Sequence, residues 1–139
     1  MKVRMLRKLE KWIQAEPRRF DMLNWSGNEY IIRKQKPRCG IVGCLAGMAC
    51  HMQGLKLTPG AGFLNDDMND EIFERARAIL DLSEKQSARL FFLPDIHHHR
   101  SLYWPGEFAA AYNKAKTPKE KVKVAVARIE HFIKTKGQE

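Results

Sequence analysis

The chain has 139 residues, and its 25 Lys and Arg outnumber its 16 Asp and Glu to give a formal net charge of +9. This length suits a single domain, 1–139, that can bury a core without disulfides or a metal. No apolar run reaches the roughly 18–20 residues of a membrane span, and the N-terminus has no signal-like apolar region. Three cysteines do not form an even disulfide framework, so we expect reduced thiols, a cytoplasmic location and no membrane association.

Residues 2–16 are predicted to form an amphipathic helix that Pro17 ends. Its apolar stripe can pack on the core while its cations face water, or the helix can lie on phosphates or on a membrane surface. The binding residues that we predict are the cations of this helix and of the basic run at residues 33–38. They are Lys2, Arg4, Arg7, Lys8, Lys11, Arg33, Lys34, Lys36 and Arg38.

Positive charge is concentrated toward both ends of the chain. Residues 1–38 hold eleven Lys and Arg against four Asp and Glu, the stretch 66–95 is acidic, and the chain is basic again from Lys114. If both ends fold onto one side, they form a positive face for nucleic acid or for an acidic or nucleoprotein partner. The alternative is a solvated surface whose charge only keeps the protein in solution.

The longest uncharged stretch of the chain begins at Cys39, and residues 39–52 within it hold all three cysteines. Small residues recur in it at helical spacing, which would let another backbone approach closely: Gly43, Ala46, Gly47 and Cys50. Glycine in a helix interior costs about 0.5–1 kcal/mol relative to alanine, so we expect tight packing to compensate and this to be the central helix. The basic run at residues 33–38 leads directly into this helix, whose N-terminus carries partial positive charge and free N–H groups. The run and the helix N-terminus could therefore bind an anion together, or the run could be an exposed loop.

Two helices are predicted over residues 69–82 and 84–92. The first has an apolar side and an acidic start, which suits the positive end of a helix dipole. Residues 83–86, Ser-Glu-Lys-Gln, form a capping box that begins the second. Its inward side chains are predicted to be Ala88, Phe91 and Phe92. The pair reads as a helical hairpin, and the alternative of a DNA-reading helix-turn-helix is disfavoured by its acidic surroundings.

The last two helices are predicted over residues 107–115 and from Thr117 to Lys136. The apolar side of the first is assigned to Phe108, Ala111 and Tyr112. Thr117-Pro118-Lys119-Glu120 combines an N-cap, a proline at the first helical position and a glutamate three residues after the cap. Gly137 is the expected stop. The predicted fold is therefore all-α, a compact orthogonal bundle of about six helices around the small-residue helix, with room for a minor β element at residues 30–32.

Two constellations would support chemistry instead of binding. Cys39, Cys44, Cys50, His51 and His97–His99 supply zinc donors, but no Cys-x2-Cys pair exists. A cysteine nucleophile at Cys39 would sit at a helix start near cations that lower a thiol pKa, with His51 or His97–His99 as base. We predict no cofactor and no metal, and keep an enzyme centred on Cys39 or Cys44 as an alternative. A structural module that binds a protein partner is the third possibility, and an exposed apolar patch would be its sign.

Several motifs, in this order, resemble a widespread family of small uncharacterised bacterial and phage-encoded proteins. They are Phe20-Asp21-Met22 with Trp25, the Cys-Gly-x-x-x-Cys-x-Ala-Gly core at residues 39–47, Leu82-Ser83-x-x-Gln86-x-Ala88-x-Leu90-Phe91, Trp104-Pro105 and Ala127–Ile133. The resemblance covers about residues 20–137. It implies a shared fold and a bacterial or phage origin, and no mechanism. The histidines at 97–99 and the basic N-terminal helix are not part of the shared pattern.

Overall fold

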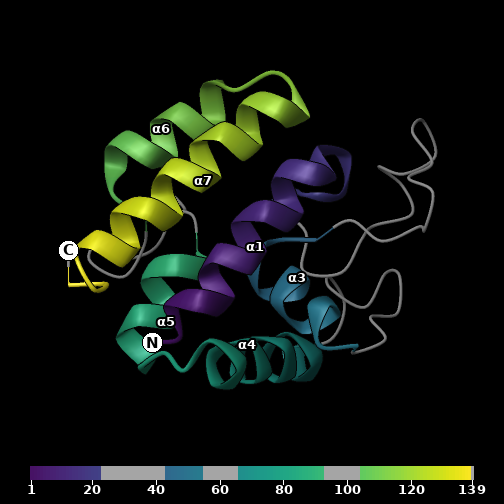
Figure 1. Ribbon diagram of the computed structural model, residues 1–139, viewed down its shortest axis with the longest axis vertical. Coiled ribbons are helices and arrows are strands. Elements are labelled where there is room, and N and C mark those ends of the chain that lie inside the picture. Colours follow the sequence, from purple (N-terminus) through teal and green to yellow (C-terminus); the bar gives the residue numbers. More distant parts are fainter. Residues whose placement is uncertain (23–42, 55–65, 93–103, 139) are drawn as a thin grey trace.

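The computed structural model describes residues 1–22, 43–54, 66–92 and 104–138, and this part of the chain is all-α, as predicted. Helices α1 and α7 lie side by side, and α4 runs across the other end of the bundle (Figure 1). The described elements are α1 (Val3–Ala15), a 3₁₀ turn η1 (Pro17–Arg19), α3 (Leu45–Met52), α4 (Asp66–Leu80), α5 (Glu84–Phe91), α6 (Gly106–Lys114) and α7 (Pro118–Lys134). The β element predicted at residues 30–32 lies outside the described residues.

The ends of the helices follow the local signals of the sequence. Both predicted capping boxes form: the Ser83 hydroxyl accepts from the Gln86 N–H at 3.3 Å, and the Thr117 hydroxyl accepts from the Glu120 N–H at 3.2 Å. Gly137 follows α7 with a φ of +66°, and a Cβ there would lie 2.7 Å from the Phe132 ring. That position therefore requires glycine. Three boundaries of α4 and α7 differ from the prediction by two or more residues. Helix α4 begins at residue 66 and not 69 and ends at residue 80 and not 82, and α7 ends at residue 134 and not 136.

Helix α3 is buried over most of its length, and it begins later than expected. It packs against α1, α4 and α5, and all its residues from Leu45 to Cys50 are buried. Gly43 lies outside the helix, because its N–H donates to the Arg19 carbonyl at 3.0 Å in a parallel bridge beside Phe20. Cys44 takes the N-cap position instead. The prediction that the helix starts near Cys39 is therefore wrong.

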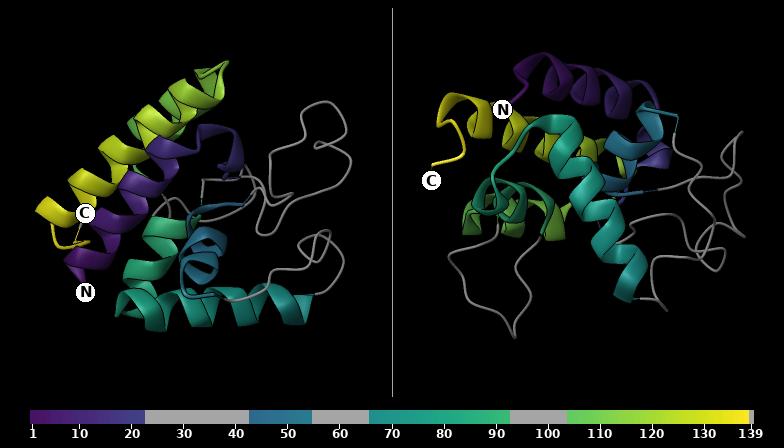
Figure 2. Two further views of the ribbon diagram at one scale, coloured as in Figure 1. Left: turned by 45° about the vertical axis from the view of Figure 1, so that its right-hand side comes forward. Right: turned by 90° about the horizontal axis from the view of Figure 1, so that it is seen from below.

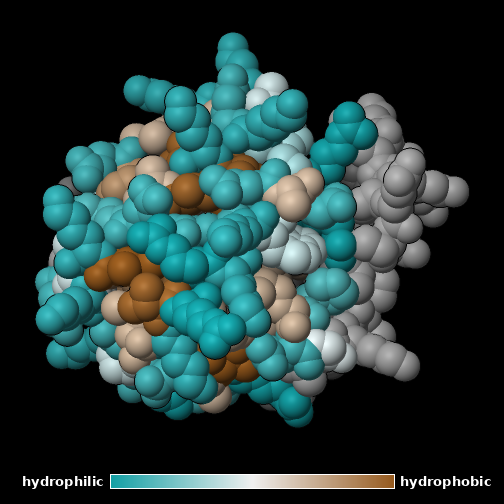
Figure 3. Space-filling view, in the orientation of Figure 1, coloured by the Kyte–Doolittle hydropathy of each residue, from teal (hydrophilic) through white to brown (hydrophobic). Residues whose placement is uncertain are grey.

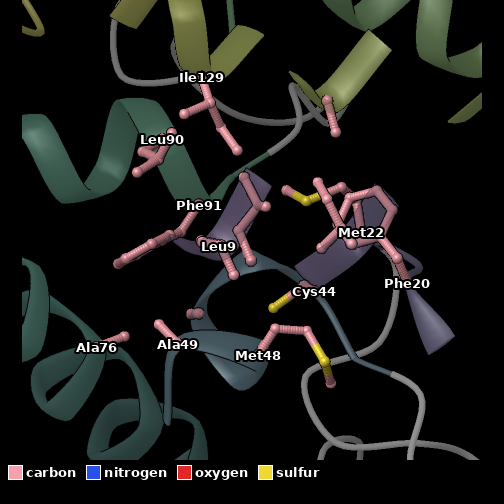
Figure 4. Packing of buried hydrophobic residues seen from close by; sticks show 14 of the residues in the cluster. Leu9, Phe20, Met22, Cys44, Met48, Ala49, Ala76, Leu90, Phe91 and Ile129 are labelled. Atoms are coloured by element: carbon pink, nitrogen blue, oxygen red, sulfur yellow. The ribbon is translucent and has the colours of Figure 1, made fainter. Parts of the chain in front are cut away.

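The small residues of α3 do allow another backbone to come close. The Cys50 thiol donates to the Ile72 carbonyl of α4 at 3.5 Å, and Ala49 points toward Ala76 of α4 (Figure 4). Residues with larger side chains at these positions would separate the two helices. The predicted close approach of another backbone is therefore seen at Cys50, whereas Ala49 was not on the predicted face.

The second half of the core joins α5, α6 and α7. Tyr112 and Trp104 are both buried and meet edge to face, with ring centroids 5.7 Å apart. The Trp104 indole donates to the Leu90 carbonyl at 2.7 Å. Two inward faces were predicted partly wrongly. In α5 the buried residues are Ser87, Leu90 and Phe91, while Ala88 and the C-cap residue Phe92 are half-buried. In α6 the buried residues are Ala109 and Tyr112, and Ala111 is exposed.

Candidate functional site

Three cations form one outward row on α1, which we call the α1 row: Arg4, Lys8 and Lys11. Their spacing of four and three residues places them on the same side of the helix, about 6 Å and 4.5 Å apart along its axis. The side opposite is the apolar stripe, where Leu6, Leu9 and Ile13 are fully buried. All three cations are exposed, and none has an acidic partner among the described residues. The α1 row is therefore open to an anionic ligand.

Two other predicted residues of α1 do not belong to that row. The Arg7 guanidinium bridges α1 and α7, at 2.9 Å from the Glu10 carboxylate and 3.2 Å from Glu130. Its hydrogen bond to Glu10 is the main cause that raises the pKa of Arg7. Lys2 is the N-cap of α1, and its N–H donates to the Leu80 carbonyl at the end of α4. Arg7 thus holds two helices together, and Lys2 lies at the α4 end of the bundle.

Helix α7 adds cations beside the C-terminal end of α1. The two helices run antiparallel, because the start of α1 and the end of α7 lie at the same end of the pair (Figures 1 and 2). A shallow groove of about 280 Å³ separates the end of α1 from the start of α7, and Lys119 and Lys123 line it opposite Gln14. Hydrophilic side chains cover most of the molecular face that carries α1 and α7 (Figure 3). We define the cationic face as the α1 row together with Lys119 and Lys123.

Other predicted site residues lie outside the described residues. These are Arg33, Lys34, Lys36, Arg38, Cys39 and His97–His99, so the basic run and the anion site predicted from it stay predictions. The α7 cations Lys119 and Lys123, which line the groove beside α1, are candidate site residues that the predicted list omitted. Basic composition from Lys114 onward was a signal for them, but only the packing of α7 on α1 places them next to the N-terminal helix.

The two described cysteines, Cys44 and Cys50, are free thiols buried in the core. Cys44 is 1% exposed, and burial raises the pKa of its thiol to about 11, so the thiol is protonated at neutral pH. Cys50 is fully buried and donates to a backbone carbonyl. His51 lies seven residues after Cys44 on the same helix, about 10.5 Å along its axis. No base is therefore brought to Cys44 from its own helix.

His51 instead belongs to a small cluster with η1 and α1. Its Nε2 lies 3.1 Å from an Arg19 guanidinium nitrogen, and that guanidinium lies 4.6 Å from the centroid of the Trp12 ring. Burial and, second, the positive charge of Arg19 lower the pKa of His51. A guanidinium can only donate, so Nε2 accepts and the imidazole is neutral. Within the described ranges, no group of three or more His, Cys, Asp or Glu residues is placed to hold a metal ion.

Comparison with known proteins adds no further assignment. No family model matches the sequence, and no curated protein and no solved structure matches it either. The resemblance to small bacterial and phage-encoded proteins therefore stays a prediction. None of the described helices has both the length and the apolar character that crossing a membrane requires.

Proposed function

We propose that the protein binds polyanions, and nucleic acid in particular, through the cationic face. The observation that supports this proposal most directly is the α1 row, three exposed cations at helical spacing without an acidic partner among the described residues. The apolar stripe packs on the core, so the row on the opposite side of the helix is available to a ligand. Lys119 and Lys123 extend the positive charge from α1 to α7.

The physical basis of binding would be the release of counterions from the phosphate backbone. Each phosphate that a Lys or Arg neutralises contributes about 0.9 to the slope of log affinity against log salt for duplex DNA. The five cations of the cationic face would then give a slope of about −4.5 if all contact phosphates. Such a protein binds with little base specificity, because phosphate contacts carry no sequence information directly.

The test is a fluorescence-anisotropy titration of a labelled 20-base-pair duplex at low salt. The variant Arg4→Gln/Lys8→Gln/Lys11→Gln removes the α1 row. Its control, Arg75→Gln/Lys85→Gln/Lys136→Gln, removes one Arg and two Lys from exposed positions on other elements.

We expect the α1 variant to lose at least tenfold in affinity and the control to lose much less. Equal losses in the two variants would mean that only net charge matters, and no binding by the wild type would remove the proposal. A single-stranded probe of the same sequence shows whether duplex geometry contributes.

Two further predictions belong with this proposal. A cytoplasmic location and a bacterial or phage origin are consistent with a small basic binding module and are part of what we propose. The enzyme alternative now depends on Cys39 and His97–His99, which lie outside the described residues, because the buried thiol of Cys44 gives it no support. Alkylation of Cys39 at neutral pH, mapped by mass spectrometry, would revive it.

A further inference from the structure

A second surface of the molecule has a different character. An open groove of about 680 Å³ runs between α6 and α7, which we call the α6–α7 groove. Its floor is apolar and comes from Phe108, Ala111, Ala115, Val124 and Ala127. Hydrophobic surface shows between hydrophilic side chains where α6 and α7 lie side by side (Figure 3). Apolar surface at the bottom of an open groove, with polar residues at its rim, is a place where a partner can bury apolar side chains.

The rim of the α6–α7 groove is positively charged at one end. Lys114 and Lys116 lie where α6 ends and α7 begins, and Lys123 lies five residues after the first residue of α7. None of the three has an acidic partner among the described residues. Glu120 also lines this end, but its carboxylate accepts from the Lys116 and Thr117 N–H groups at 2.8 and 3.1 Å. These hydrogen bonds, the one from Lys116 first, lower the pKa of Glu120. The other acid of the rim, Glu107, lies in the first turn of α6.

We propose that the α6–α7 groove binds a short amphipathic helix of a partner protein that carries acidic residues beside its apolar face. Two antiparallel helices leave a groove that a third helix fills in a bundle, with its apolar side chains at positions i, i+4 and i+7. The nine residues of α6 make this groove about 13.5 Å long, and three such anchors span about 10.5 Å. The acidic residues of the partner then face Lys114, Lys116 and Lys123.

The length, the apolar floor and the charged rim of the α6–α7 groove together favour an acidic amphipathic helix as its ligand. They do not favour the polyanion that we propose for the cationic face. A nucleic acid would satisfy the lysines but leave the apolar floor exposed to water. A basic or neutral helix would cover the floor but leave the lysines without counter-charges, or repel them. The two surfaces share Lys123. The inference does not rest on the proposed function, because its apolar floor lies between α6 and α7, away from the α1 row.

The probe is a labelled synthetic peptide of about 15 residues, with leucines at i, i+4 and i+7 and flanking glutamates. A second peptide replaces the glutamates by lysines. Binding to the full chain is followed by anisotropy and by amide shifts in ¹⁵N spectra. Ala111→Glu places a charge in the groove, and Ala110→Glu places the same charge at the neighbouring exposed position, which does not line it.

We expect saturable binding of the glutamate peptide, with amide shifts concentrated in α6 and α7. Ala111→Glu should weaken binding at least tenfold and Ala110→Glu less than twofold. Lys114→Gln/Lys116→Gln should reduce the preference for the glutamate peptide over the lysine peptide. Thermal unfolding of each variant checks that its fold is retained.

Several results would overturn the inference. They are the absence of saturable binding, equally tight binding of both peptides, equal losses in the two alanine variants, and amide shifts centred on α1. A wild-type dimer in sedimentation velocity that Ala111→Glu dissociates would identify a second copy of the chain as the occupant, which also contradicts it.

Discussion

Replacing Cys44 by alanine is expected to change how stability depends on alkaline pH. The native thiol is 1% exposed, and burial raises its pKa from 9.0 to about 11. In the unfolded chain the thiol ionises at its ordinary pKa, so between these two values unfolding releases a proton, and stability falls as pH rises. Each pH unit between them lowers the free energy of unfolding by about 1.4 kcal/mol. From pH 8 to pH 10 the wild type should therefore lose about 1.3 kcal/mol more than Cys44→Ala.

Urea unfolding followed by circular dichroism at pH 8, 9 and 10 measures this difference. Met48→Leu is the control, because it alters the same buried helix without removing an ionisable group, and its pH dependence should parallel that of the wild type. Parallel curves for Cys44→Ala and the wild type would refute the reasoning. So would iodoacetamide labelling of Cys44 in the native protein at pH 8 as fast as in urea, because a buried and protonated thiol reacts slowly.

Three further substitutions test other parts of the structure. Tyr112→Phe should lower the free energy of unfolding by about 2 kcal/mol, because the Tyr112 hydroxyl accepts the buried Met22 N–H at 2.8 Å; a loss below about 0.5 kcal/mol in urea unfolding would contradict this. Thr117→Ala should cost about 1 kcal/mol and Thr117→Ser much less, since only alanine removes the cap; equal melting temperatures would argue against the cap. His51→Gln should flatten stability at acid pH, because the depressed pKa of native His51 makes the wild type less stable as pH falls below 6.5. If the free energy of unfolding changes equally between pH 8 and pH 5 in His51→Gln and in the wild type, the pKa of His51 in the cluster with Arg19 does not affect stability.

The features that local sequence could predict are those whose cause lies within a few residues. The capping boxes at Ser83 and Thr117 each need only a hydroxyl and, three residues later, a side chain that returns the hydrogen bond. The outward direction of the α1 row follows from its spacing against the apolar stripe. Gly137 is required by its own φ and by the nearby Phe132 ring.

Features that depend on distant partners escaped prediction. Gly43 fits a helix by spacing, but a hydrogen bond to Arg19, which lies 24 residues earlier, keeps it outside α3. Arg128 stands among the apolar residues of α7 and is fully buried, because its guanidinium lies over the Phe108 and Phe132 rings and donates to the Arg89 carbonyl at 3.0 Å. Pairing across the fold has no signal in the neighbouring sequence.

The candidate site, like the fold, could be predicted only in those parts that depend on nearby residues. Composition indicated which segments are basic, and helical periodicity indicated which cations of α1 face outward. Neither could show that Arg7 is engaged by Glu130, 123 residues away, or that Lys119 lies beside the end of α1. Packing of α7 against α1 decides both, so a binding face made by two helices can be outlined from sequence but not completed.

The central claim is that the cationic face binds polyanions, and the salt dependence of duplex binding tests it most directly. The slope of log affinity against log salt is measured for the wild type, for Arg4→Gln/Lys8→Gln/Lys11→Gln and for the control with three cations removed elsewhere. Three lost phosphate contacts should reduce the magnitude of the slope by about 2.7 in the first variant, while the control keeps the slope of the wild type. Identical slopes in all three proteins would contradict the claim.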